Sequence, residues 1–143
     1  MLIELNPIYR AAWEAVKGSG SYYYGDPDKI EQAGKELCFP CLLRLLRTMD
    51  RINSGIQGKI TCDRNETFLF GLKVAEFPDE DEEVLENRIR WMANEFFKNL
   101  RASRKVRFTE PTEQRWYRRD LNQFSLCLAF TAYVTPLQED LLC

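Results

Sequence analysis

The stretch ETFLFGLKVAEF, residues 66–77, runs directly into PDEDEEVLENRIRWMANEFFKNLRASRK, residues 78–105, and together they decide the fold. In the first segment, the side chains that recur at every second position are apolar: Phe68, Phe70, Leu72 and Val74. A period of two is typical of a strand with one buried face. We therefore expect residues 66–77 to form a strand whose apolar face lies toward the core.

The second segment predicts one long amphipathic helix. Its apolar side chains recur at steps of three and four residues and form a single stripe: Leu85, Ile89, Met92, Phe96 and Leu100. Asp79 or Asp81 can cap its N-terminus, and the acidic first turns suit the positive end of the helix dipole. Basic residues suit its C-terminal end: Lys98, Arg101, Arg104 and Lys105. About 20 residues give a helix roughly 30 Å long.

The N-terminal half carries weaker patterns. Residues 6–17 predict a short helix, with Asn6 as the N-cap and Pro7 at the first helical position. The sequence GSGS that follows is interpreted as a flexible break, and the segment YYYGDPDK, from Tyr22 onward, as residues leading into a turn. The role of Tyr22, Tyr23 and Tyr24 stays open at this level.

Two further segments precede the central strand. FPCLLRLLRTM, residues 39–49, is apolar and predicts either a strand or a helix that begins at Pro40. NSGIQGK, residues 53–59, predicts a loop or the tip of a hairpin. The whole stretch 48–59 is therefore expected to be an extended loop.

The C-terminal part predicts two more strands. Residues 105–110 read as a short strand, and a long one is expected from about residue 122 to residue 134. One face of the long strand holds Leu126, Leu128, Phe130, Ala132 and Val134, and the other holds Cys127, Ala129 and Tyr133. Pro136 should end the strand because proline cannot donate to a ladder.

These elements predict an α+β fold. We expect an antiparallel sheet of about four strands, packed against one long amphipathic helix and a shorter N-terminal helix. Residues 1–136 should form a single domain, and residues 137–143 a loose C-terminal tail.

Composition excludes several classes of function. A net charge of −2 gives no bulk attraction to nucleic acid or to a membrane surface. No apolar run approaches the ~20 residues that span a bilayer, and no signal peptide is visible, so we expect a chain made in a cytosol. The sequence has no histidine, which excludes nucleophile–histidine catalysis and histidine-containing zinc sites. No cofactor is expected.

Cys38-Phe39-Pro40-Cys41 has the spacing of a thiol–disulfide enzyme. A redox pair of that kind follows a buried strand and begins a helix, which lowers the pKa of the first thiol. The preceding residues EQAGKE do not form a buried strand, and Cys62, Cys127 and Cys143 offer no second close pair for a metal site. We prefer the interpretation that Cys41, and with it Cys38, are small apolar residues entering a strand.

Charge is unevenly distributed along the chain. The helix start is acidic, at Asp79, Glu80, Asp81, Glu82 and Glu83, and lacks the alternating spacing of a calcium loop. The segment after the helix is basic and contains Arg115, Arg118 and Arg119 beside Trp116 and Tyr117. It resembles a nucleic-acid patch, although a solvated or protein-facing loop is the interpretation we favour. Opposite charges at separated places let protomers join head to tail, and such heterologous contacts can close into rings.

The order of elements resembles a known family. A helix, an FP-led strand, a loop, the strand TFLFGLKVAEF, an acidic-capped helix, a basic loop and the ending LNQFSLCLAFTAYVTP are similar to the tail terminator, or tail-completion, proteins of long-tailed bacteriophages. The likeness covers roughly residues 37–136, and the aromatic ending with Phe130, Tyr133 and Val134 carries much of it.

The resemblance implies a structural virion protein without enzymatic activity, assembled in the host cytoplasm. It implies a ring, usually hexameric, that caps the tail tube and joins it to the head connector. The expected interface lies between the acidic residues Asp79–Glu83 and the basic residues Arg115, Arg118 and Arg119 of a neighbour or of the tube. Two alternatives stay open: a redox protein that uses Cys38 and Cys41, and a nucleic-acid-binding module that uses the basic loop.

Overall fold

Two long antiparallel strands form the centre of the molecule. The computed structural model describes residues 4–25, 38–45, 50–54, 60–118 and 125–137. Strand β4 (Ile60–Lys73) pairs with β7 (Ser125–Pro136) from Arg64↔Val134 to Lys73↔Ser125. The helix-facing side chains of β4 are buried as the alternation predicted, up to Leu72. Val74 lies beyond the strand, in a short 3-10 turn η2 (Val74–Glu76), and packs half-buried against the core.

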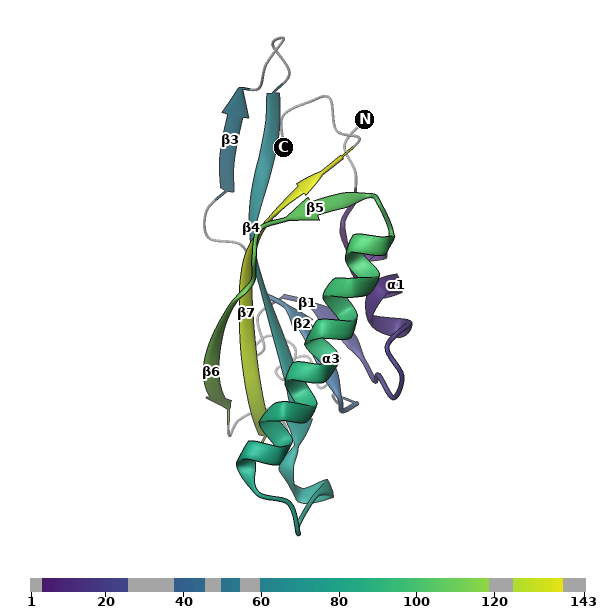
Figure 1. Cartoon of the computed structure of the whole chain (residues 1–143), viewed down its shortest axis with the longest axis vertical. Helices are drawn as coiled ribbons and strands as arrows, with labels where there is room; N and C mark the ends of the chain where they lie inside the picture. The colour runs from purple at the N-terminus through teal and green to yellow at the C-terminus, as the bar shows by residue number, and fades with distance from the viewer. Residues whose placement is uncertain (1–3, 26–37, 46–49, 55–59, 119–124, 138–143) are drawn as a thin grey trace.

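Shorter strands extend the sheet on both sides. On one side of β4 lie β2 (Cys41–Arg44), with β1 (Tyr22–Tyr24) beyond it, and β3 (Asp50–Ser54). On the far side of β7 lie β5 (Val106–Phe108) and β6 (Thr112–Arg118), one after the other along its edge. Figure 1 shows this arrangement.

The sheet therefore differs from the predicted antiparallel sheet of about four strands. The described residues form a sheet of seven strands, and it is mixed because β1 and β2 run parallel. The α+β class itself is as predicted, with helices α1 and α3 against the sheet. Parallel strands are not joined by a short turn. The sequence around Tyr22–Tyr24 therefore gives no local sign that this segment pairs with β2.

Two segments expected to be loops contain strands. Asp50–Ser54 pairs antiparallel with β4, up to Ser54↔Ile60, so the described part of residues 48–59 is a strand and not a loop. The basic segment before β7 holds β6, in which Arg115 lies opposite Leu128 and Arg118 opposite Ser125. Both strands are polar and pair at a sheet edge, where an apolar period of two is not required.

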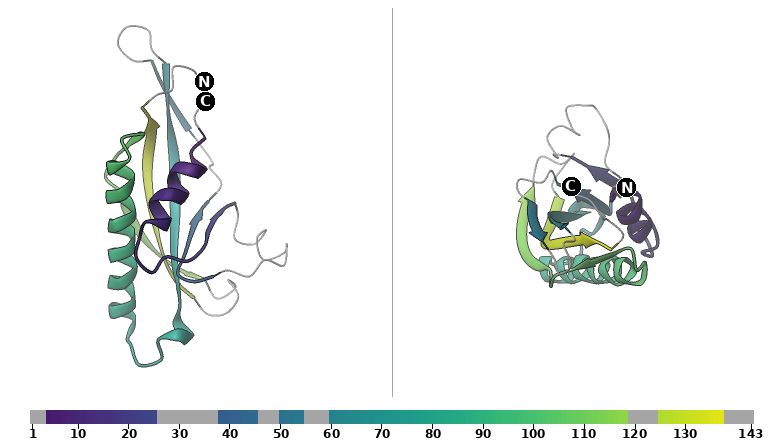
Figure 2. Two further views of the ribbon diagram at one scale, coloured as in Figure 1. Left: turned by 90° about the vertical axis from the view of Figure 1, so that its right-hand side faces the viewer. Right: turned by 90° about the horizontal axis from the view of Figure 1, so that it is seen from above.

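Both helices cover the same face of the sheet (Figure 2). Helix α1 (Asn6–Glu14) and helix α3 (Glu82–Ala102) also contact each other. The predicted stripe of α3 is buried in full, and Phe97 joins it. The N-cap of α1 differs from the prediction, because Leu5 and not Asn6 occupies it. Asp81 stands at the N-cap of α3 as predicted, although its side chain makes no hydrogen bond to the helix.

An aromatic cluster fills the space between helices and sheet. Phe96 of α3 lies 5.1 Å from Phe68 and 5.6 Å from Phe70, measured between ring centroids. Tyr9 of α1 meets Phe68 edge to face at 4.9 Å. Such tilted and edge-to-face pairs add about 0.5–1.5 kcal/mol each beyond the burial of their area. The cluster ties both helices to β4.

The opposite face of the sheet has its own smaller apolar cluster, formed by Cys41, Leu43, Leu69, Cys127 and Ala129. Gly71 lies between Cys41 and Cys127 in the register of three adjacent strands. A Cβ atom at Gly71 would stand 3.1 Å from the sulfur of Cys41 and 3.2 Å from that of Cys127. The two sulfur atoms thus fill the space that glycine leaves open.

Other expectations fall outside the described residues. They concern the turn over residues 26–28, Arg119 and the tail from residue 138 onward. The chain is described to Leu137, one residue after β7 ends at Pro136. Within the described part, no helix has the length and apolar character that crossing a membrane requires.

Candidate functional site

The Cys-x-Pro-Cys segment does not have the geometry of a redox pair. Cys38 is exposed, whereas Cys41 is fully buried as the first residue of β2, and both are free thiols. Burial, followed by the proximity of Cys127, raises the pKa of the Cys41 thiol far above its ordinary value. A strand rather than a helix follows the pair, so no helix dipole stabilises a thiolate. Cys41 acts here as a small apolar side chain.

The described residues hold no group of three or more cysteine, aspartate or glutamate side chains arranged to bind a metal ion.

A buried polar cluster joins the start of α1 to strands β1, β2 and β4. Arg44 and Glu66 form an ion pair with 2.8 Å between Nε and Oε2, and their side chains are only 5% and 0% exposed. The Oδ1 atom of Asn6 accepts hydrogen bonds from Arg44 at 3.1 Å and from the hydroxyl of Tyr22 at 2.7 Å. The guanidinium of Arg44 also lies over the ring of Tyr24, 4.4 Å from its centroid.

The surroundings of this cluster shift the pKa values of Arg44, Tyr9 and Tyr22. Burial is the largest single influence on Arg44 and would lower its pKa, but the charge and hydrogen bond of Glu66, together with Tyr9 and Tyr22, raise the pKa by more and the net shift is upward. Burial raises the pKa of Tyr9 and of Tyr22, and the carboxylate of Glu66 adds to the rise in both. The cluster consequently holds a charged pair and two neutral phenols. These groups are shielded from solvent, which fits a role in positioning α1 against the sheet.

Arg44 and Glu66 were not predicted as a pair, although each is a charged residue within an apolar sequence pattern. Glu66 is in phase with Phe68 and Phe70 in the alternation, which places it on the buried face. Arg44 interrupts an otherwise apolar run. A charge that falls in phase on a buried face requires a partner, and two such charges of opposite sign in adjacent strands predict each other.

The predicted acidic residues lie at the end of the molecule where α3 begins. Asp79, Asp81, Glu82 and Glu83 are exposed, and Glu80 is partly so. Glu80 accepts a hydrogen bond of 3.0 Å from Arg88, whose guanidinium lies 4.6 Å from the centroid of the Phe77 ring. The acidic segment is thus a solvent-facing surface with one internal ion pair at its border.

Two of the predicted basic interface residues, Arg115 and Arg118, lie on strand β6. Arg118 pairs with Ser125, which also pairs with Lys73, the last residue of β4 before the turn toward the acidic segment. The Arg118 end of β6 and the acidic segment therefore share one end of the molecule, as Figure 1 shows, and are not separated along its length. Other exposed basic residues lie in the last turn of α3 and just after it: Arg101, Arg104, Lys105 and Arg107.

One contact fastens α3 to β6. Arg90 donates to both carboxylate oxygens of Glu113, at 2.7 Å from Nε and 3.2 Å from Nη2. The hydrogen bond with Glu113 raises the pKa of Arg90 above its ordinary value. The pair fixes the start of β6 beneath the helix, so the arginines that follow in β6 have a set position relative to α3.

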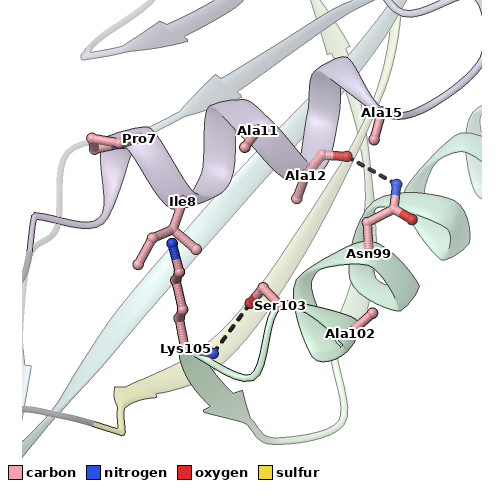
Figure 3. Close-up of a pocket in the computed structure, with 9 residues that line it drawn as sticks. All are labelled: Pro7, Ile8, Ala11, Ala12, Ala15, Asn99, Ala102, Ser103 and Lys105. Atoms are coloured by element: carbon pink, nitrogen blue, oxygen red, sulfur yellow. Dashed lines mark hydrogen bonds between the residues drawn. The ribbon is translucent and has the colours of Figure 1, made fainter.

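A groove of about 410 Å³ lies between α1 and α3. Small side chains line most of it, and Lys105 stands at one end (Figure 3). Asn99 donates to the carbonyl of Ala12 at 3.0 Å, and Ser103 donates to the carbonyl of Leu100 at 2.6 Å. These two polar groups are already used within the fold, so the groove does not present a converging set of catalytic groups.

No protein-family model matches this chain, and no curated protein matches it at a significant level.

Proposed function

We propose that this protein is a structural assembly protein that forms a ring and resembles the tail terminators of long-tailed phages. The acidic surface at Asp79–Glu83 of one protomer would meet the basic edge of the next, at Arg115, Arg118 and Arg119. The ring would cap the tail tube and join it to the head connector. The acidic surface is exposed to solvent, and the two surfaces carry opposite charges.

One observation supports this proposal above the others. The acidic segment and the Arg118 end of β6 lie at the same end of the molecule but on different elements, since β6 is an edge strand beyond β7 and the acidic segment follows β4. Contacts around a ring join two different surfaces at one height along the ring axis. Complementary surfaces at one end meet that condition when the long axis of each protomer runs along the ring axis.

The strength of such a contact comes from repetition. Each exposed ion pair contributes only about 0–1 kcal/mol. In a closed ring every protomer uses both of its surfaces, so the small terms recur at each interface. Complementary charge also sets register and accelerates association.

Charge reversal tests the proposal. A variant with Arg115, Arg118 and Arg119 changed to glutamate should fold normally, as judged by circular dichroism, while complete tails and joined head–tail particles fall sharply in electron micrographs. The matched control reverses three exposed basic residues that follow α3 and lie in neither proposed contact: Arg104, Lys105 and Arg107. The control should lower particle counts much less.

A compensating variant sharpens the test. Changing Asp79, Glu82 and Glu83 to lysine in a second copy should restore association with the reversed basic edge in a mixture of the two proteins. Normal particle numbers from the reversed variant would show that the basic edge is only a solvated surface. Binding of DNA at low salt by the wild type, lost on reversal, would support a nucleic-acid-binding module in its place.

A further inference from the structure

Helix α3 carries an exposed strip on the side opposite to its buried stripe. Val84 and Trp91 are 46% and 48% exposed, although both are large apolar side chains. They are seven residues apart, which is close to two helical turns, so they lie on one face. A half-exposed tryptophan in the middle of a helix face is typical of the residues that anchor protein interfaces.

The strip has nothing over it in the part of the chain that the structure describes. Helix α3 forms the outermost layer of the molecule, with the sheet and α1 on its other side (Figure 2). The ion pairs that α3 makes with Glu80 and Glu113 come from Arg88 and Arg90 and lie at the margins of the strip. Val84 and Trp91 are left facing solvent between them.

We propose that this strip is a two-fold interface with a second copy of this chain, in which two α3 helices pack antiparallel across Trp91. The order of charged residues along α3 supports this orientation. Starting from the N-terminal end, the strip and its borders read Asp81, Glu83, Arg88, Trp91, Glu95, Lys98 and Arg101. Trp91 stands near the middle of Glu82–Ala102.

An antiparallel pair centred on Trp91 brings each positive side chain to a negative one. Arg88 then faces the turn that holds Glu95 of the second copy. Lys98 faces Val84 and Glu83 of the second copy, and Arg101 faces its Asp81. A parallel pair would place each of these side chains against the same side chain of its neighbour, with like charges opposed. The sequence of the strip is therefore complementary to itself in one orientation only.

This contact goes beyond the ring proposed above and uses a different centre. Trp91, Arg88, Glu95 and Lys98 belong to the two-fold contact alone, and Arg115, Arg118 and Arg119 belong to the ring contact alone, whereas Asp81 and Glu83 border both. Because a two-fold axis presents the same residues twice, one substitution removes two contacts. The two interfaces can consequently be separated by mutation.

Sedimentation and light scattering across a concentration series test the two-fold contact. The wild type should form a dimer, and Trp91→Ala should raise the dimer dissociation constant at least about tenfold. Leu137→Ala removes a side chain that is equally exposed but lies off α3, and it should leave the constant unchanged. The variant with Arg115, Arg118 and Arg119 reversed should still dimerise, which separates this test from that of the ring.

Charge exchange checks the orientation. Arg88→Glu should weaken the dimer, and the double variant Arg88→Glu with Glu95→Arg should restore it, which a merely misfolded single variant would not do. In a Cys38→Ser background, Trp91→Cys should form a disulfide between two copies under mild oxidation. Lys98→Cys should not cross-link to itself, because antiparallel packing separates the two positions by roughly 20 Å along the helices.

Two results would overturn the proposal. One is a wild type that stays monomeric at concentrations of several hundred micromolar. The other is a Lys98→Cys variant that cross-links to itself as fast as Trp91→Cys, which would show a parallel contact.

Discussion

Arg44 of β2 and Glu66 of β4 form an ion pair of 2.8 Å beneath the start of α1, where both side chains are almost completely buried. The attraction between these two opposite charges raises the pKa of Arg44 despite its burial. Asn6 and Tyr22 complete the surroundings of Arg44 through the shared Oδ1 acceptor. This pair is the point at which α1, β1, β2 and β4 are joined.

The Arg44→Met variant should lose about 3–5 kcal/mol of unfolding free energy, because it leaves the carboxylate of Glu66 buried without a partner. The double variant Arg44→Met with Glu66→Leu should be clearly more stable than Arg44→Met alone, since no uncompensated charge remains. Urea unfolding of both variants measures the difference. Equal losses in the single and double variants would show that the guanidinium is needed for its contacts with Asn6 and Tyr24 and not for its charge.

Phe96 stands at the centre of the aromatic cluster and is fully buried. Phe96→Ala should cost roughly 3–5 kcal/mol in the free energy of unfolding, through lost burial and the cavity that remains. The exposed neighbour Lys98 provides a control, and Lys98→Ala should change stability by less than about 0.5 kcal/mol. A loss for Phe96→Ala as small as that of the control would contradict the packing of α3 on the sheet.

Gly20 is required by the close approach of two backbone segments. A Cβ atom at this position would meet the carbonyl oxygen of Pro40 and would lie 2.7 Å from that of Cys38. Backbone atoms cannot rotate away, so Gly20→Ala should lower the thermal unfolding midpoint by several degrees or prevent folding. Gly18 has open space around it but a φ of +80°, so Gly18→Ala should show only the smaller cost of backbone strain. Equal losses at both glycines would contradict this account.

Gly71 differs because side chains, and not backbone, occupy the space above it. Gly71→Ala should be destabilising because its methyl group would press on the sulfurs of Cys41 and Cys127. In the double variant Gly71→Ala with Cys127→Ala, the new methyl group takes space that the lost sulfur vacates. Its loss should therefore be smaller than the sum of the two single losses, by about 0.5 kcal/mol or more in a double-mutant cycle. Strict additivity would argue against this contact.

Stability should fall in alkaline solution. The pKa values of Cys41, Tyr9 and Tyr22 are all raised in the folded protein, chiefly by burial. Their stabilising contribution is complete below the pKa values of the unfolded chain, about 8.5 for the thiol and about 10 for the phenols. Above those values the unfolded chain loses protons that the folded protein keeps, so the unfolding free energy decreases by about 1.4 kcal/mol per pH unit for each group.

Urea titrations between pH 7 and pH 11 measure this dependence. The Tyr9→Phe variant keeps the ring contacts but has no phenol, so its slope above about pH 10 should be shallower than that of the wild type by the share of one proton. Identical slopes in the two proteins would show that the pKa of the Tyr9 hydroxyl is the same in the folded and the unfolded chain.

The sequence by itself determined the elements whose pattern is local. The alternation through Phe68, Phe70 and Leu72 identified the central strand, and the stripe from Leu85 to Leu100 identified the long helix, because each face must bury its apolar side chains. The short strand at Val106–Phe108 and the long strand ending at Pro136 were recognised for the same reason.

Only the tertiary structure decided how distant segments pair. The parallel pairing of Tyr22–Tyr24 with β2, and the edge strands Asp50–Ser54 and Thr112–Arg118, have little or no apolar period because their pairing partner stabilises them. The same pairing places the Arg118 end of β6 at the same end of the molecule as the acidic segment (Figure 1). Hydrogen bonds between strands far apart in the chain leave no periodic pattern in either strand, so only the folded structure reveals which strands pair.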